Sequence, residues 1–126
     1  MDRQVVTGAE LPPSIGPYAH AVRAGGFVFV SGQPGVDPAT GDVPSSFPDQ
    51  ARQAFANLAT VLRAAGSRPD LAVSTTVLVA DQADFPEMNE RFAEFFPTDP
   101  PARMTMQVPL PRGLLISVGC TAVAAD

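Results

Sequence analysis

The strongest hydrophobic pattern in the chain is a stripe of apolar residues with helical spacing between positions 45 and 66. Ser45 or Ser46 can cap the start of a helix here, and Gly66 can end it. A single apolar stripe is typical of a helix that buries one face. The stripe consists of Ala51, Ala54, Phe55, Leu58, Val61, Leu62 and Ala65.

A second, shorter helix is predicted over residues 84–96. Asp84 and Glu87 have the spacing of a capping box, with Asp in place of Ser or Thr, and Pro86 suits the first turn. Several prolines from position 97 onward end the helix. Its expected buried stripe is Phe85, Met88, Phe92 and Phe95.

The remaining apolar segments have the composition of β-strands. Residues 3–6 could form a short edge strand. Residues 18–24 and 27–30 flank Gly25-Gly26, which indicates a hairpin, and the run 27–30 is apolar on both faces and predicts a central strand. Three more strands are expected. The second of them has the pattern of a buried strand, except that it begins with a charged residue, Arg103. These three segments are 71–81, 103–108 and 113–125.

The expected order is therefore β, ββ, α, β, α, ββ, with no linker or repeat, in a single domain over residues 1–126. Two helices on one face of a mixed β-sheet form an α+β fold. The other face of that sheet would be left uncovered. Symmetric oligomerisation is the usual way to cover such a face.

The charge composition narrows the function. All eight cations are arginines, and the net charge is −5. Nucleic-acid binding needs clustered positive charge, so we expect no nucleic acid and no anionic membrane surface as a partner. The absence of lysine excludes a Schiff base on a lysine side chain. No secretory signal and no membrane-spanning run is evident, so a cytoplasmic protein is expected.

The chain has one cysteine and one histidine. An intrachain disulfide and an ordinary zinc site are therefore excluded. Cys120 lies in apolar company in the last strand, and we interpret it as a small core residue. His20 lies in the first strand of the hairpin and is interpreted as a satisfied or solvent-facing side chain.

Five segments resemble one protein family when they are taken together. In order they are IGPYAHAV, FVSGQ, VLRAAG, MNERFAEFF and PPARMTMQV. They resemble the RidA/YjgF family of imine and enamine deaminases, over about residues 15–123. The resemblance implies a chorismate-mutase-like α+β fold, with two helices on one face of a mixed sheet. It further implies a homotrimer with a barrel-like core and active sites between subunits.

The resemblance also implies a reaction. Members of the family hydrolyse small 2-imino or enamine carboxylic acids to 2-oxo acids and ammonia, without a metal or an organic cofactor. An older label of the family is endoribonuclease. A ribonuclease would have to bind RNA, and the acidic charge of this chain disfavours that function.

The family's carboxylate-binding arginine falls on Arg103, the alternative being a solvated surface arginine. A guanidinium can bind a carboxylate through two parallel hydrogen bonds and stays charged at any working pH. The family's helix asparagine falls on Asn89, which could also be a surface amide. The position two after the arginine is Thr105, whose backbone N–H would remain available to a substrate.

Three further site residues are implied by the resemblance. The family's tyrosine falls on Tyr18, and its serine-glycine pair falls on Ser31 and Gly32, where the backbone can approach a ligand closely. Tyr18 could instead be a half-buried strand residue, and Ser31 a turn residue.

One position departs from the family pattern. The deaminases carry a glutamate in the last strand that positions the attacking water, and the matching residue here is Ser117. Residues 104–125 contain no Asp or Glu at all. Serine can hydrogen-bond a water but is no base near neutral pH. Catalysis would then rely on Arg103, Tyr18 and Ser117, with Ser31, Gly32, Asn89 and Thr105 binding the substrate.

Three functions remain open for this predicted site. The chain could be an imine/enamine deaminase, or it could be a non-catalytic sensor that binds a small carboxylate. It could also be a deaminase of another catabolic intermediate, such as an aminoacrylate or an aminomuconate. Ribonuclease activity is a fourth, disfavoured reading.

Overall fold

The computed structural model describes residues 2–125 and follows the expected order of elements. The helices are α1 (Phe47–Ala64) and α2 (Phe85–Phe95), each near a short 3₁₀ turn, η1 (Pro69–Leu71) and η2 (Gln82–Asp84). The strands are β1 (Arg3–Val5), β2 (Ala21–Ala24), β3 (Phe27–Pro34), β4 (Ala72–Val79), β5 (Ala102–Gln107) and β6 (Ile116–Val123).

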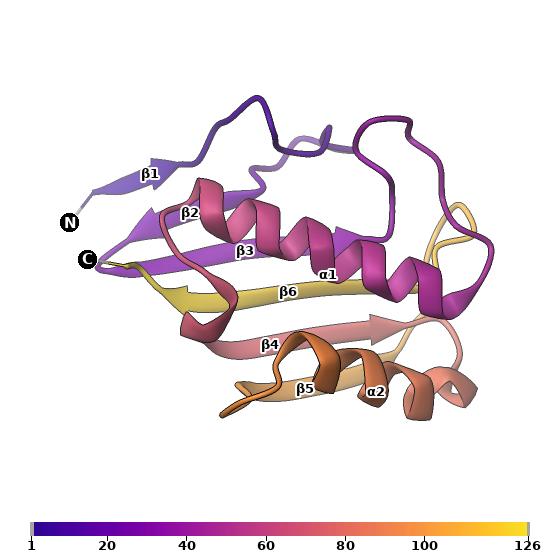
Figure 1. Cartoon of the computed structure of the whole chain (residues 1–126). Helices are drawn as coiled ribbons and strands as arrows, with labels where there is room; N and C mark the ends of the chain where they lie inside the picture. Colours follow the sequence, from indigo (N-terminus) through magenta and orange to yellow (C-terminus); the bar gives the residue numbers. More distant parts are fainter. Residues whose placement is uncertain (1, 126) are drawn as a thin grey trace.

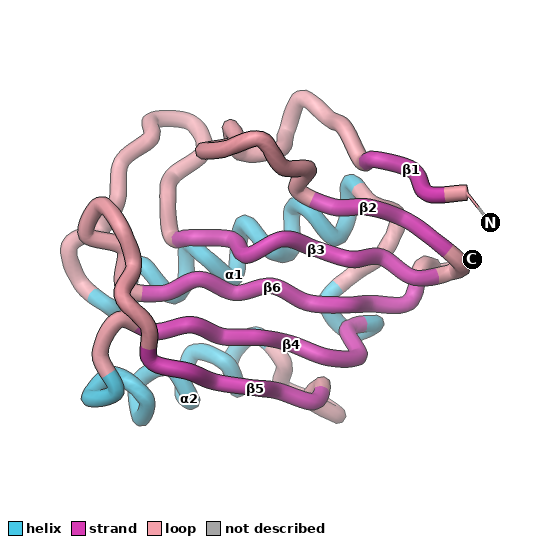
Figure 2. Tube along the Cα trace, turned by 180° about the vertical axis from the view of Figure 1, so that it is seen from behind, coloured by secondary structure: helices cyan, strands magenta, loops and turns pink. Residues whose placement is uncertain are grey.

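The strands form one sheet in the order β1-β2-β3-β6-β4-β5. Only β4 and β5 are parallel neighbours, and the other pairs are antiparallel. The chain crosses from β3 over β6 to β4 through α1, and then from β4 to β5 through α2 (Figure 1). Both crossovers advance across the sheet in the same direction, so connections of the same hand place both helices on one face. Figure 2 shows the other face bare. The predicted α+β fold is confirmed.

Helix α1 has the ends that its sequence predicts. The Ser46 hydroxyl accepts a hydrogen bond from the Asp49 N–H at 3.3 Å, and this contact caps the first turn. Gly66 has a φ of +79°, and the N–H of Ser67 donates to the Leu62 carbonyl at 2.8 Å. These contacts satisfy backbone groups at both ends of the helix.

The capping box expected at α2 is wrong. Asp84 has φ −86° and ψ 0°, and its side chain caps nothing. The carboxylate of Asp81 instead accepts from the Ala83 N–H at 2.9 Å, at the start of η2. Because η2 runs directly into α2, Asp84 lies in continuous helical backbone, whereas a capping residue needs an extended conformation.

The segment 103–108 is an exposed edge strand and not a buried one. Met104 is 60% exposed and Met106 is 40% exposed. Strand β6 inserts between β3 and β4, so β5 pairs with β4 alone. The strand that carries Arg103 therefore offers one unpaired backbone edge to its surroundings.

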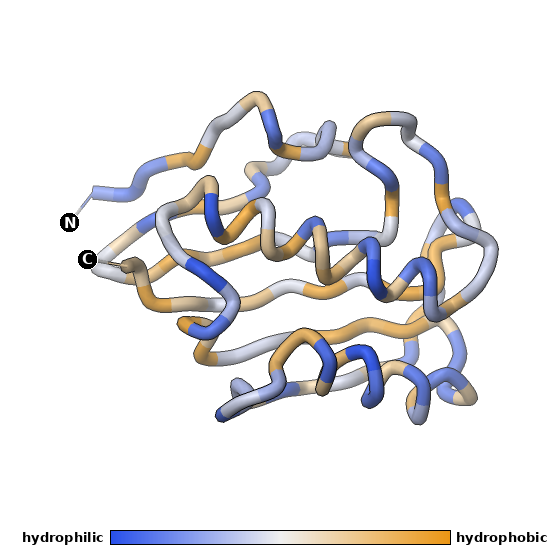
Figure 3. Tube along the Cα trace, in the orientation of Figure 1, coloured by the Kyte–Doolittle hydropathy of each residue, from blue (hydrophilic) through white to orange (hydrophobic). Residues whose placement is uncertain are grey.

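The core lies between the helices and the sheet. Figure 3 shows apolar residues concentrated in the central strands β3, β6 and β4. The bare face also carries large exposed apolar side chains, a pattern that marks interaction surfaces. None of the helices within residues 2–125 is long and apolar enough to cross a membrane. The exposed side chains of the bare face include Phe27, Phe29, Met104, Met106 and Val123.

Candidate functional site

Arg103 lies on the helix-covered face of β5. Its Cα pairs with that of Thr75, which is buried beneath the helices. The guanidinium carbon lies 4.8 Å from the centroid of the Phe92 ring, and Nη1 lies 3.8 Å from the Met88 sulfur. Among residues 2–125, no carboxylate lies within ion-pair distance of Arg103. An arginine that is fixed on an aromatic ring without an acid beside it can receive an anion.

Thr105 adds a second donor beside Arg103. The Val108 N–H donates to the Val79 carbonyl at 3.0 Å, so it points toward β4. The N–H groups of Met106 and Met104, two and four residues earlier, point the same way. Peptide groups alternate in a parallel ladder, so the N–H of Thr105 points toward the free edge. The Thr105 hydroxyl is buried and has no hydrogen-bond partner in the described part of the chain.

Asn89 lies on α2 next to Met88 and three residues before Phe92, so it borders the helix surface that holds Arg103. Its side chain is exposed. A cavity of about 510 Å³ opens beside Arg103, with apolar walls from Phe92 and Phe96. We refer to Arg103, Thr105 and Asn89 as the anchor half of the candidate site.

Ser31 ties the N-terminal segment to the end of β3. Its N–H donates to the His20 carbonyl at 2.9 Å, and its hydroxyl donates to the Ala19 carbonyl at 2.7 Å. The register of β3 against β6 shifts between Val30 and Gln33, so the Ser31-Gly32 peptide lies in a β-bulge. Tyr18 precedes these contacts directly, and the residue is 39% exposed.

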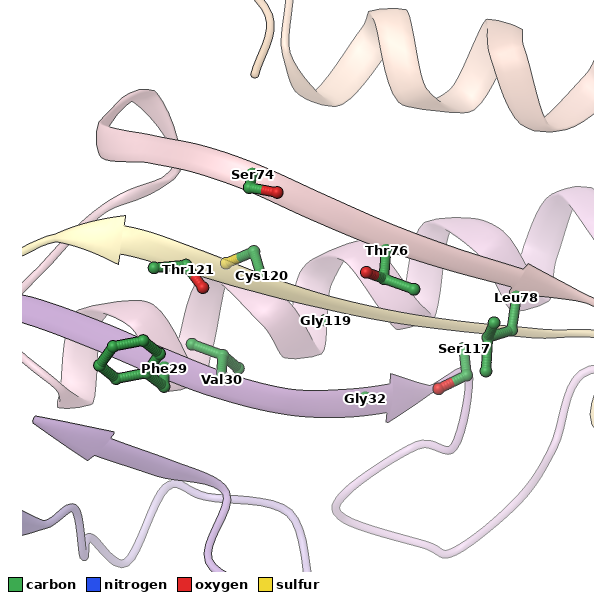
Figure 4. Close-up of a pocket in the computed structure, with 10 residues that line it drawn as sticks. All are labelled: Phe29, Val30, Gly32, Ser74, Thr76, Leu78, Ser117, Gly119, Cys120 and Thr121. Atoms are coloured by element: carbon green, nitrogen blue, oxygen red, sulfur yellow. The ribbon is translucent and has the colours of Figure 1, made fainter. Parts of the chain in front are cut away.

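Gly32 and Ser117 meet on the bare face of the sheet. A Cβ atom added to Gly32 would lie 2.6 Å from the Ser117 hydroxyl oxygen, so only glycine fits without a shift. Figure 4 shows the Ser117 hydroxyl at the end of β3, in a depression of about 380 Å³ that also contains Ser74, Thr76 and Thr121. We refer to Tyr18, Ser31, Gly32 and Ser117 as the bulge half.

One chain does not bring the two halves together. Arg103 pairs with Thr75, whereas Ser117 pairs with Leu78, three residues further along β4. Three residues of strand span roughly 10 Å, and the distance from β5 across β4 to β6 is also roughly 10 Å. The two side chains point to opposite faces of the sheet. The structure thus gathers the predicted site residues into two separate groups.

His20 and Gln33 form a buried polar pair behind the bulge half. His20 precedes β2 instead of lying within it, and it is only 7% exposed. The Gln33 side-chain nitrogen lies 3.1 Å from His20 Nδ1, while Nε2 has no partner among residues 2–125. The ring is therefore not solvent-facing, and of its two nitrogens the described chain satisfies Nδ1. Sequence reasoning missed Gln33, since nothing in an isolated glutamine indicates burial.

Cys120 lies in the core of β6, as predicted, and burial raises the pKa of its thiol to about 12. A thiol with such a pKa stays protonated near neutral pH and is a poor nucleophile. Within the described residues, no group of three or more His, Cys, Asp or Glu side chains could hold a metal ion.

Comparisons with known proteins identify the family of the chain. The family model described as endoribonuclease L-PSP matches residues 8–124. The chain is 41% identical to a mouse protein named 2-iminobutanoate/2-iminopropanoate deaminase, covering 96% of this chain and 91% of that protein. It is 40% identical to the chloroplastic reactive intermediate deaminase A of Arabidopsis thaliana, covering 95% of this chain and 65% of that protein.

A solved structure is similar over nearly the whole chain. The crystal structure of TdcF from E. coli with bound serine superposes with a TM-score of 0.91 at 33% sequence identity. The match covers 97% of this chain and 98% of that one.

Proposed function

The chain belongs to the endoribonuclease L-PSP family, also known as RidA/YjgF, and we propose that it hydrolyses small 2-imino and enamine carboxylic acids to 2-oxo acids and ammonia. The observation that carries this proposal is Arg103, a guanidinium fixed on the Phe92 ring without an acidic partner among residues 2–125. Two relatives about 40% identical are named as deaminases, one of them for 2-iminobutanoate and 2-iminopropanoate, which supports the reaction class.

In this proposal the anchor half binds the substrate. The Arg103 guanidinium donates two parallel hydrogen bonds to the carboxylate, and the Thr105 N–H at the free edge of β5 is a further donor. A water molecule adds to the C=N carbon, the nitrogen is protonated and leaves as ammonia, and a C=O bond remains. The balance is one water consumed and one ammonia released, with no change in oxidation state. Orientation and charge neutralisation supply the acceleration.

We further propose that a complete site forms between two copies of the chain, the anchor half from one and the bulge half from its neighbour. The two halves lie on opposite faces of one sheet, and the bare face is rich in exposed apolar side chains. The family resemblance supports a homotrimer with three such sites as this assembly. In the trimer, Tyr18, Gly32 and Ser117 of one copy would face Arg103 of the next.

Subunit mixing tests the composite site. Arg103→Ala inactivates the anchor half, and Gly32→Val inactivates the bulge half, so each variant alone should be inactive. After the two are unfolded together at equal amounts and refolded, random assembly gives about a quarter of the sites two intact halves. Activity near that level supports the composite site. If mixing restores none although mixed oligomers form, the site lies within one chain.

A second candidate function is non-catalytic binding of a small carboxylate. It is favoured by one observation, the absence of Asp and Glu from residues 104–125. Ser117 can hydrogen-bond a water without removing its proton. Under the deaminase proposal, the alignment of the water by Ser117 and Tyr18 suffices because imines are easily hydrolysed.

One experiment separates these functions. Imino acids are generated in place by an amino-acid oxidase, with catalase present, and ammonia and 2-oxo acid are measured with wild type and Arg103→Ala. Wild-type acceleration that is lost in the variant supports the deaminase. Calorimetric binding of 2-oxobutanoate that needs Arg103, without turnover, supports the binding protein. A panel with aminoacrylate and aminomuconate identifies the preferred substrate.

Restoring the carboxylate sharpens this test. Ser117→Glu should raise kcat roughly 10- to 100-fold with little change in KM, because a carboxylate can accept a proton from the water. Thr121→Glu adds the same charge elsewhere on the bare face and is the control. Equal effects of the two substitutions would show that position 117 has no special relation to the reacting water.

A further inference from the structure

The buried pair of His20 and Gln33 lies directly behind the Ser31-Gly32 peptide, and neither residue has a role in the reaction above. We propose that His20 is a positioning residue, held as its Nε2–H tautomer, which fixes the Ser31-Gly32 peptide through Gln33. The catalytic part of this inference rests on the proposed function. The structural part stands on the hydrogen bonds alone.

The Ser31 carbonyl decides which way the Gln33 amide points. The Gln33 side-chain nitrogen lies 3.0 Å from this carbonyl oxygen and 3.1 Å from His20 Nδ1. A carbonyl can only accept, so the NH₂ group and not the oxygen of the amide must face it. One amide hydrogen goes to Ser31, and the other goes to His20.

This arrangement selects one form of the histidine. His20 Nδ1 must accept a hydrogen bond from Gln33, so it carries no proton, and in the neutral ring the proton is on Nε2. The opposite tautomer would direct an N–H at the NH₂ group of Gln33. Turning the amide over would avoid that clash but would direct the Gln33 oxygen at the Ser31 carbonyl.

The network acts on the peptide that the bulge half uses. The Ser31 C=O and the Gly32 N–H belong to one planar trans peptide and point in opposite directions. Gln33 holds the C=O from behind, so the Gly32 N–H is directed away from the core. The His20 backbone carbonyl also accepts a hydrogen bond from the Ser31 N–H. The imidazole ring of His20 meets the Tyr18 ring edge-on, with ring centroids 6.0 Å apart. His20 therefore contacts two members of the bulge half, Ser31 and Tyr18.

A contribution to stability alone does not explain the polar pair of His20 and Gln33. His20 Nε2 and the Gln33 side-chain oxygen are both buried and have no partner within residues 2–125. An unpaired buried polar atom costs free energy that an apolar pair at the same positions would not cost. What the polar pair provides, and an apolar pair cannot, is a donor aimed at the Ser31 carbonyl.

Two variants of similar shape isolate the acceptor. Asparagine places Oδ1 two bonds beyond Cβ, as histidine places Nδ1, whereas leucine has the same branching without an acceptor. We expect His20→Leu to lower kcat/KM roughly 10- to 100-fold and His20→Asn to stay within about threefold of wild type, since small displacements of aligned groups are costly. Equal losses in the two variants would overturn the positioning role.

Nitrogen-15 NMR tests the same inference without activity. His20 is the only histidine, so one long-range ¹H–¹⁵N correlation of the untagged wild-type protein reports its tautomer. We expect Nε2–H at neutral pH, and a Gly32 amide signal that moves in His20→Leu and much less in His20→Asn. An Nδ1–H tautomer overturns the inference even if His20→Leu fails to fold. Absence of wild-type deaminase activity would refute the proposed function, while the tautomer would still decide this inference.

Discussion

The anchor half and the bulge half of the candidate site are built in opposite ways. Arg103 rests on the Phe92 ring at an exposed sheet edge, and in the described chain its guanidinium has a side-chain hydrogen-bond contact only with a methionine sulfur, at 3.8 Å. The Ser31-Gly32 peptide is instead held by hydrogen bonds from Ser31 to Ala19 and His20, and from Gln33 to Ser31. One half supplies an uncompensated charge, and the other supplies a fixed backbone.

Substitutions in the two halves should therefore affect different properties of the protein. Removing a charge from an exposed edge should weaken substrate binding and hardly affect folding. Disturbing a packed and hydrogen-bonded bulge should alter geometry and stability together.

Arg103→Met should break the anchor half without unfolding the chain. We expect kcat/KM to fall roughly 10²- to 10³-fold, because the substrate carboxylate would lose its charged partner. The free energy of unfolding should change by less than about 1 kcal/mol. Arg103→Lys should lie between, because an ammonium cannot form the two parallel bonds. Enzyme kinetics and urea unfolding measure the two quantities.

Arg68→Met is the matched control for this charge removal, since Arg68 is a surface arginine that pairs with Asp70 at 2.9 Å. It should leave kcat/KM within about twofold of wild type, as surface substitutions usually do. A comparable loss of activity in both variants would mean that net charge, and not the position of Arg103, is responsible.

Gly32→Ala should disturb the bulge half through Ser117. The new Cβ would lie 2.6 Å from the Ser117 hydroxyl oxygen but 3.9 Å from its Cβ. We expect a destabilisation of about 1–2 kcal/mol and a several-fold lower kcat/KM, since overpacking forces neighbours to shift. In a Ser117→Ala background the clash is absent, so most of the destabilisation should disappear. Additive free energies of unfolding in this double-mutant cycle would rule out the contact.

Cys120 lies on β6 between the two halves and should matter least for activity. Burial raises the pKa of its thiol from 9.0 to about 12, so the folded state holds the proton more tightly than the unfolded state. The resulting stability is fully present below about pH 9 and is lost as pH rises toward 12. Relative to Cys120→Ala, wild type should therefore lose free energy of unfolding across that range.

The same thiol should resist alkylation at pH 8 until the chain unfolds, and Cys120→Ala should retain wild-type kcat/KM. Rapid modification of the folded protein, with loss of activity, would place Cys120 in the site instead of the core.

The elements were readable from the sequence because their signals are local. The apolar stripe, Ser46 and Gly66 define α1 within one continuous segment, and Gly25-Gly26 defines the hairpin. The capping box at Asp84 failed although its spacing is correct, because the preceding turn η2 continues into α2. A local signal is reliable only when the chain beside it is not already helical.

The site residues were assigned from segments that match the family. Their division into an anchor half and a bulge half could not be predicted from those segments. Arg103 and Ser117 are fourteen positions apart and lie on opposite faces, because Arg103 pairs with Thr75 and Ser117 with Leu78. Pairing partners are set by which strands become neighbours, and no residue of β5 or β6 encodes that choice alone.

The order of elements and the α+β class follow from the sequence, because apolar periodicity, caps and turn glycines act over a few residues. The family follows from the five matched segments, not from these local signals. Three features are visible only in the folded chain: β6 separates β3 from β4, β5 forms an exposed edge, and Gln33 is buried against His20. The reason is physical: strand order and burial result from long-range packing of the whole chain, in which each contact depends on segments distant in sequence.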